Sequence, residues 1–216
     1  MKKEKGICRY YYRGYYCGSN HKPCDCRRIK LDEFNTMKTK DIIVISTGFI
    51  LLIIGMLFDK QIADFFIINN NNAVHNILGV LTYLGEWYII LIIMTLFFLF
   101  RSKSKLPIFW IAFLSANIIT SIIKFAVARD RPLEGSLSFP SGHATAAFAL
   151  LPFMFREGMK IGYAWFVLAL LIVFTRLYLS QHFMTDVAAG LLIGYIISEI
   201  VLSLTGKYGK INKQLK

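Results

Sequence analysis

A histidine and a carboxylate stand close together where an apolar segment begins. His182 and Asp186 are four residues apart, so a helix would place both on one face. A carboxylate in that position can accept the Nδ1 proton of the imidazole and leave Nε2 free as a nucleophile or base. Ionisable groups inside apolar helices are costly and usually have a function. The pair is therefore a candidate for catalysis rather than for packing.

A second histidine lies at an expected helix start. Pro140 fixes the approach of the chain, Ser141 suits the N-cap, and Gly142 lets the backbone come close to a ligand. The first amides of a helix have no partner inside it, so such a start binds anions. His143 would lie beside this anion site as a possible proton donor.

Three cations accompany these groups. Lys124 and Arg131 are seven residues apart, which is two helical turns or about 10 Å along one helix face. Pro132 then turns the chain. Arg176 precedes His182 at the end of another apolar run. Snorkelling of the long cations to lipid headgroups is the alternative interpretation of the first two.

Apolar runs must carry these residues. Hydrophobic residues make up 56% of the 216, which is typical of a chain embedded in lipid. A spanning helix needs about 20 apolar residues, although about 17 can suffice. We therefore predict an all-α polytopic membrane protein with six transmembrane helices in a bundle. The six runs are 42–58, 87–100, 106–128, 144–155, 161–179 and 183–204.

The positive charges give the bundle an orientation. The formal net charge is +12, but 20 of the 25 basic residues fall in the segments 1–40, 101–105, 156–160 and 207–216. Six spans put these four segments on one side, which should be the cytoplasm. This distribution argues against nucleic acid as a partner. We expect a cytosolic tail over 1–40, a membrane domain over 41–206 and a second basic cytosolic tail over 207–216.

The same order of spans brings the candidate residues together. The third run ends near Lys124, the fourth begins at His143, the fifth ends near Arg176 and the sixth begins at His182. All four ends lie at the face opposite the basic segments. Cations with open helix amides suit a phosphate, and two histidines suit its transfer.

Two other segments have less specific patterns. The N-terminal tail holds all four cysteines, Cys8, Cys17, Cys24 and Cys26, which are either free thiols or ligands of a structural zinc ion. Their spacing is not the usual pair of Cys-x2-Cys knuckles. Residues 59–86 contain short amphipathic stretches expected along the outer interface. In this segment His75 is interpreted as a surface histidine.

Three motifs together resemble those of the type 2 phosphatidic acid phosphatase superfamily, which includes lipid phosphate phosphatases, undecaprenyl pyrophosphate phosphatases and vanadium haloperoxidases. The resemblance covers roughly residues 40–205. It departs from the family at Thr175, where a serine is usual. The motifs are Lys124-x6-Arg131-Pro132, Pro140-Ser141-Gly142-His143 and Thr175-Arg176-x5-His182-x3-Asp186.

The resemblance implies a role for each residue. His182 would attack phosphorus and become a phosphohistidine, Asp186 would hold its tautomer, and His143 would protonate the leaving oxygen. No metal or other cofactor would take part, because the cations supply the electrostatic stabilisation. The groups that hold the phosphoryl oxygens would be Lys124, Arg131, Ser141, Gly142 and Arg176.

We therefore expect an integral protein of the plasma membrane with its active site on the extracytoplasmic side and both termini in the cytoplasm. It would hydrolyse a phosphate ester or pyrophosphate on a lipid, with polyprenyl pyrophosphate favoured over phosphatidic acid, phosphatidylglycerol phosphate and lipid A. Its partners would be this substrate and membrane lipids. Two alternatives stay open: a lipid phosphotransferase, and a non-catalytic membrane protein that binds anionic lipid. The sequence does not indicate an oligomeric state.

Overall fold

The computed structural model describes residues 8–11, 14–17, 22–23, 26–133 and 135–214, with side chains for 39–133 and 135–205. The chain divides into two compact units, residues 1–44 and 45–216. The first unit contains a small antiparallel sheet in the order β1-β2-β3, which the sequence analysis did not predict. Tyrosines in β1 and β2 favour strands, since aromatic side chains suit a pleated backbone. The strands are β1 (Cys8–Tyr11), β2 (Gly14–Cys17) and β3 (Lys22–Pro23).

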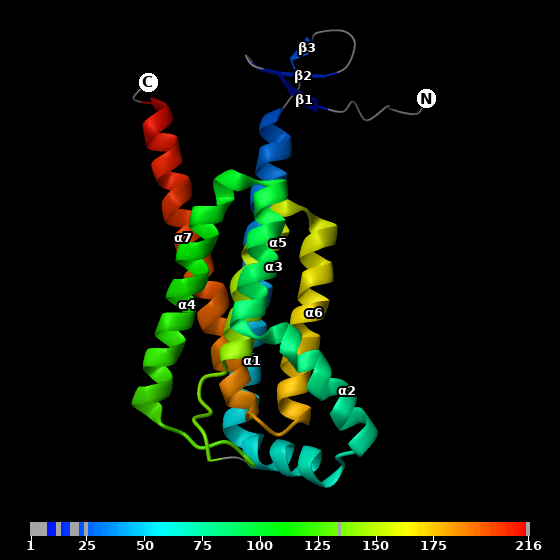
Figure 1. Ribbon diagram of the computed structural model, residues 1–216. Helices are drawn as coiled ribbons and strands as arrows, with labels where there is room; N and C mark the ends of the chain where they lie inside the picture. Colours follow the sequence, from blue (N-terminus) through cyan, green and yellow to red (C-terminus); the bar gives the residue numbers. More distant parts are fainter. Residues whose placement is uncertain (1–7, 12–13, 18–21, 24–25, 134, 215–216) are drawn as a thin grey trace. The chain divides into compact units, whose positions relative to one another are not determined.

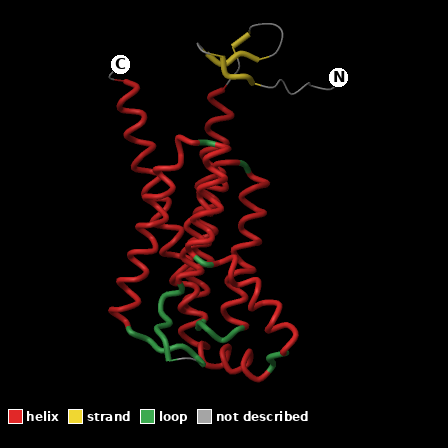
Figure 2. Tube along the Cα trace, in the orientation of Figure 1, coloured by secondary structure: helices red, strands yellow, loops and turns green. Residues whose placement is uncertain are grey.

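The second unit is built from helices (Figures 1 and 2). Successive helices α3 to α7 alternate in direction, so the end of one lies at the same end of the bundle as the start of the next (Figure 1). The helices of the chain are α1 (Cys26–Ile68), α2 (Asn72–Thr82), α3 (Trp87–Arg101), α4 (Leu106–Val127), α5 (Gly142–Glu157), α6 (Met159–Tyr178) and α7 (Met184–Gln214), with short 3-10 turns η2 (Tyr83–Gly85) and η3 (Lys103–Lys105).

Helix length and composition support four or five of the six predicted spans. Within the described residues, four helical segments are long and apolar enough to cross a membrane: 39–68, 103–127, 159–178 and 184–205. A fifth is possible if 72–85 and 87–101, which are bent by 55° at Glu86, form one broken span. The remaining predicted span, α5, has only 16 residues. The chain is thus an integral membrane protein with four or five clear candidate spans.

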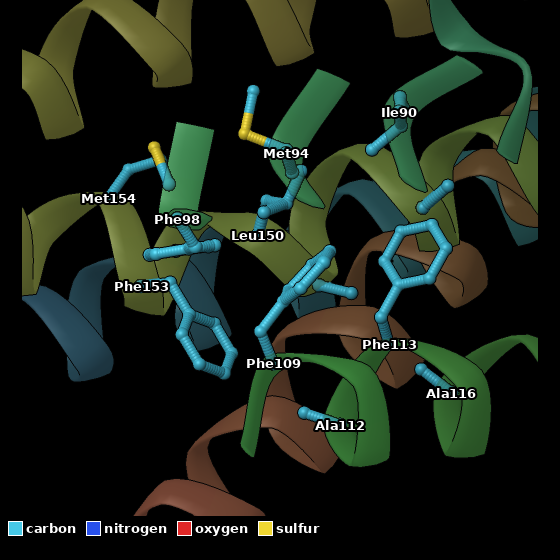
Figure 3. Close-up of a cluster of buried hydrophobic side chains, with 12 residues drawn as sticks. Ile90, Met94, Phe98, Phe109, Ala112, Phe113, Ala116, Leu150, Phe153 and Met154 are labelled. Carbon is cyan, nitrogen blue, oxygen red and sulfur yellow. The ribbon is translucent and has the colours of Figure 1, made fainter. Parts of the chain in front are cut away.

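Helix α5 is short because it lies inside the bundle and not against lipid. Every residue from Ala144 to Met154 is buried, and α5 packs on α3, α4, α6 and α7. On one side its Phe153 meets Phe98 of α3 and Phe109 of α4, with ring centroids 6.0 and 5.8 Å away (Figure 3). Such edge-to-face contacts contribute beyond the area they bury. These rings fix α5 between its neighbours.

Glycines let α7 approach α5 on another side. A Cβ at Gly190 would overlap the Ser141 carbonyl oxygen, and one at Gly194 would overlap the Thr145 carbonyl oxygen. Small residues spaced by four are a common way for membrane helices to pack backbone against backbone. The two helix starts are joined by a hydrogen bond from Ser141 N to the Asp186 carbonyl, 2.9 Å long. This close contact sets the position of both histidine-bearing segments.

Replacing Gly194 with alanine should destabilise the bundle. The new Cβ would lie 2.9 Å from Ala149 N as well as against the Thr145 carbonyl, and neither backbone atom can move without separating the helices. We expect a loss of about 1–3 kcal/mol in the free energy of unfolding, measured by SDS titration in mixed micelles. Gly79→Ala is the matched control, because a Cβ there meets no atom within 4 Å. Equal stability of Gly194→Ala and the unchanged protein would contradict this packing.

Candidate active site

The predicted residues meet at one end of the bundle, where α4 and α6 end and α5 and α7 begin (Figure 1, lower end). Lys124 is in the last turn of α4, and its Nζ donates to the carbonyls of Leu137 and Ser138 at 3.2 and 3.0 Å. The prediction that Arg131 shares a helix face with Lys124 is wrong. Helix α4 stops at Val127, and Ala128 adopts a left-handed φ of 50°, so Arg131 lies in the following loop.

The predicted pair of His182 and Asp186 lies at the start of α7. His182 precedes the helix by two residues and Asp186 is in its first turn, so they do not share a helix face as predicted. Even so, His182 Nδ1 lies 3.5 Å from Asp186 Oδ2. Both side chains are almost fully buried, at 2% and 0% exposure. The predicted pairing is therefore present, and it comes from the loop that leads into the helix.

Burial sets the protonation state of His182. Removal from water lowers the pKa of His182 to about 4, because desolvation of the imidazolium outweighs the contact with Asp186. At neutral pH the ring is therefore uncharged. With Asp186 beside Nδ1, the Nε2 lone pair is the one available to attack an electrophile.

Several donors hold the Asp186 carboxylate. Ser138 Oγ and the backbone N of Phe183 donate to Oδ2, the latter at 2.8 Å. Arg129 donates to Oδ1 at 3.1 Å. Asp186 is thus fixed by three donors in addition to its contact with His182.

Arg129 and Asp59 belong to the site, although neither was among the predicted site residues. Arg129 Nη2 pairs with Asp59 Oδ2 at 2.9 Å, and its Cζ lies 3.9 Å from the centroid of the Phe183 ring. Asp59 also accepts from the backbone N of Thr185 at 3.0 Å. It directly follows Phe58, where α1 leaves helical geometry. Arg129 was visible as a cation beside an apolar run, whereas no sequence signal pointed to Asp59.

The start of α5 leaves donors open. Ser141 occupies the N-cap position, but its hydroxyl makes no capping bond, and its buried Oγ has no partner among the described residues. A Cβ on Gly142 would meet no atom within 4 Å. His143 Nε2 lies 3.4 Å from Glu86 Oε1, a carboxylate that the sequence analysis did not single out. The helix amides, the Ser141 hydroxyl and an imidazole can thus face a bound anion together.

Arg176 is buried at the end of α6 and oriented by polar neighbours. Its Nη1 donates to Thr82 Oγ1 at 2.7 Å, and its Nη2 donates to Gln181 Oε1. Thr175, the departure from the family motif, donates to the Ile172 carbonyl at 2.7 Å and contacts Thr82 Oγ1 at 3.1 Å. The hydroxyl at this position thus supports the same threonine that holds Arg176.

Some of the predicted site residues line a cavity of about 420 Å³. Arg131, His143 and Arg176 line it from three different segments of the chain. His75 also lines it, so the interpretation of His75 as a surface residue is wrong. The remaining lining residues are Gly79, Thr82, Tyr83, Glu86, Leu179 and Gln181.

The zinc hypothesis for Cys8, Cys17, Cys24 and Cys26 falls on side chains outside the described ones. Within the described side chains, no group of three or more histidine, cysteine or acidic residues is placed to hold a metal ion. The end of the bundle that holds the cavity brings together cations, the open amides of α5, His143 and His182, which suit binding and transfer of a phosphoryl group.

Comparison with known proteins agrees with this chemistry. Residues 104–210, which contain all three motifs, match the PAP2 superfamily. The chain is 29% identical over 160 residues to the lipid A 4'-phosphatase of Porphyromonas gingivalis, covering 61% of this chain and 67% of the relative. It is 27% identical over 175 residues to an undecaprenyl-diphosphatase of Sulfolobus acidocaldarius, covering 71% and 84%. Its fold matches the crystal structure of a PAP2-type phosphatidylglycerolphosphate phosphatase from Bacillus subtilis with a TM-score of 0.63 at 22% identity, covering 78% and 96%.

Proposed function

The chain belongs to the PAP2 superfamily and is a membrane phosphatase, and from this premise we propose that it hydrolyses a phosphate ester or pyrophosphate on a lipid. Polyprenyl pyrophosphate is the favoured substrate, and similarity to an undecaprenyl-diphosphatase supports that choice. The observation that carries the proposal is the buried pair of His182 and Asp186. His182 directly follows Gln181, which lines the cavity together with Arg131 and Arg176.

The reaction proceeds in two displacements. His182 Nε2 attacks phosphorus, and the bond from phosphorus to the leaving oxygen breaks as the phosphohistidine forms. His143 gives its proton to the leaving oxygen, and the nearby Glu86 carboxylate favours the charged imidazolium that this step needs. Water then attacks the phosphohistidine, loses a proton to His143 and releases inorganic phosphate.

The remaining groups of the site stabilise charge on the phosphoryl oxygens. Lys124, Arg131 and Arg176 supply positive charge, and the Ser141 hydroxyl and the amides at Gly142 supply hydrogen bonds. Preorganised donors of this kind are typically worth about 10²–10³-fold each in an acyl-transfer site, and more where the donor is charged. This set of side chains can carry out the phosphoryl transfer by itself.

We further propose that α5 also crosses the membrane, which completes the six predicted spans, and that the active site faces away from the cytoplasm. The opposite end of the bundle carries Arg101, Lys105 and Arg156, which pair with Glu157 or Glu199 of the same end. Basic residues at helix ends favour the cytoplasmic side. A short helix that is surrounded by protein can cross the bilayer interior without matching its full thickness.

Labelling tests this orientation. Ser136 is exposed in the loop between α4 and α5, so a cysteine placed there should react with a membrane-impermeant maleimide in intact cells. The unchanged protein, with Cys8, Cys17, Cys24 and Cys26, should react only after lysis. We expect labelling of Ser136→Cys before lysis. Labelling of the native cysteines alone in intact cells would invert the topology.

Phosphate release tests the activity. The purified protein in detergent should release phosphate from polyprenyl diphosphates, with phosphatidic acid, phosphatidylglycerol phosphate and lipid A compared in the same assay. Because the three cations carry the charge of the transition state, we expect turnover to persist in EDTA. Transfer of the phosphate to an added lipid alcohol without release would favour a phosphotransferase instead. Binding of these lipids without any turnover would contradict the proposal.

A further inference from the structure

We propose that His75 of α2 binds a second phosphate, the one that stays with the leaving group of a diphosphate substrate. This assignment rests on the proposed function. It makes α2 the element that distinguishes lipid diphosphates from lipid monophosphates. Three observations carry it: the size of the cavity, the tautomer of His75, and the way α2 is fastened to α6.

The cavity is larger than one phosphate needs. Its 420 Å³ would hold on the order of ten water molecules at roughly 30 Å³ each, whereas a phosphate replaces only a few of them. His143, the second residue of α5, lines the cavity, and α2 and η2 line it through His75, Gly79, Thr82 and Tyr83. A phosphate held at the start of α5 therefore leaves room toward α2.

A neighbouring amide sets the tautomer of His75. Asn70 Nδ2 lies 3.1 Å from His75 Nδ1. With the amide nitrogen as the donor of this contact, Nδ1 accepts and Nε2 carries a proton. The half-buried imidazole thus offers an N–H donor to the cavity that it lines.

Helix α2 is held against α6 at both of its ends. At the start, Asn71 N donates to the Tyr178 hydroxyl at 3.1 Å, and Asn71 Oδ1 caps the helix through Ala73 N at 2.9 Å. At the end, Thr82 accepts from Arg176 and contacts Thr175. His75 is therefore fixed relative to Arg176, as a residue that binds one substrate together with Arg176 must be.

The charges of the cavity suit a diphosphate. Arg131 and Arg176 face it together with His143, and Glu86 is the one acidic side chain among its described lining residues. Since Glu86 contacts His143, its charge is partly compensated. His182 attacks the terminal phosphorus and His143 protonates the bridging oxygen, so the second phosphate lies beyond His143. Among the side chains of α2 and η2 that line the cavity, His75 supplies a ring N–H donor beside the hydroxyls of Thr82 and Tyr83.

Two substrates with the same tail test the assignment: farnesyl diphosphate and farnesyl phosphate. Because a hydrogen bond to a charged group is lost, His75→Ala should lower kcat/KM for the diphosphate about tenfold or more. For the monophosphate it should stay within about twofold. His75→Gln keeps an N–H donor and should restore part of the loss. Asn76→Ala, the exposed neighbour on α2, is the control and should change neither rate.

The outcomes separate this assignment from the proposed function. An equal loss on both substrates would overturn the assignment, as would full activity of His75→Ala on the diphosphate. If the unchanged protein hydrolyses the monophosphate alone, the assignment fails and the phosphatase stands. If it hydrolyses neither of them nor any other lipid phosphate, the proposed function fails and the assignment with it.

Discussion

Replacing His182 with alanine should abolish turnover while the protein still inserts and folds. In the proposed reaction the side chain supplies the attacking nitrogen, and its burial beside Asp186 keeps the ring uncharged and oriented. General acid-base groups alone are worth about 10²–10⁴-fold, and loss of the nucleophile should cost at least as much. The measurement is kcat/KM for phosphate release, normalised to folded protein recovered from the membrane.

The chain offers a matched control for this substitution. His21→Ala makes the same change outside the three motifs, and activity should be unaffected. Thermal unfolding in detergent should show that His182→Ala is folded. A variant that keeps more than a tenth of the activity would remove His182 from the mechanism.

Asp186→Asn should give the second largest loss, about 10²–10⁴-fold in kcat/KM. An amide can present its NH2 to His182 Nδ1 and so favour the wrong tautomer, the effect known for the carboxylate of serine protease triads. It also has one fewer acceptor oxygen for Arg129, Ser138 and the Phe183 amide, which all donate to the carboxylate. We therefore expect a lower unfolding temperature together with the loss of activity.

Glu199→Gln controls for the loss of a charge on the same helix. Glu199 also lies on α7 and pairs with Arg156, with both oxygens 2.8 Å from the guanidinium nitrogens. It is at the far end of the bundle from His182, so its neutralisation should leave kcat/KM within about threefold. Equal losses for Glu199→Gln and Asp186→Asn would mean that charge on α7 matters for folding rather than for the orientation of His182.

The site residues were predictable where their chemistry is local. His143 follows a helix start, and His182 and Asp186 are close in sequence, so their spacing already contains most of the geometry. Asp59 and Glu86 were missed, because each reaches the site from a part of the chain distant in sequence, and ordinary acidic residues give no sign of a distant partner. His75 was misjudged for the same reason, since only tertiary structure places α2 beside Arg176.

The fold was predictable as helical and membrane-embedded, and helix length supports four or five of the six predicted spans. Apolar composition cannot distinguish a helix that faces lipid from one that faces other helices. Helix α5 is the second kind, and with 16 residues it is shorter than a lipid-facing span is expected to be. The end of α4 was also not predictable from apolar composition. The helix stops at Val127 because Ala128 is left-handed, so Arg131 lies in a loop and not on the helix face that the spacing predicted.

The burial of α5 has a consequence for how the enzyme responds to its membrane. Bilayers of different thickness act on helices through their lipid-facing apolar surface, which tilts or shifts to match the hydrocarbon layer. The spans over 39–68 and 103–127 expose most of their surface and would respond first. Helix α5, which begins at Gly142 and His143, is surrounded by protein and would move only with the bundle as a whole. The depth of His143 relative to Asp186 is thus set by contacts between helices, so a thinner or thicker bilayer should alter how the lipid substrate reaches the site more than the chemistry within it.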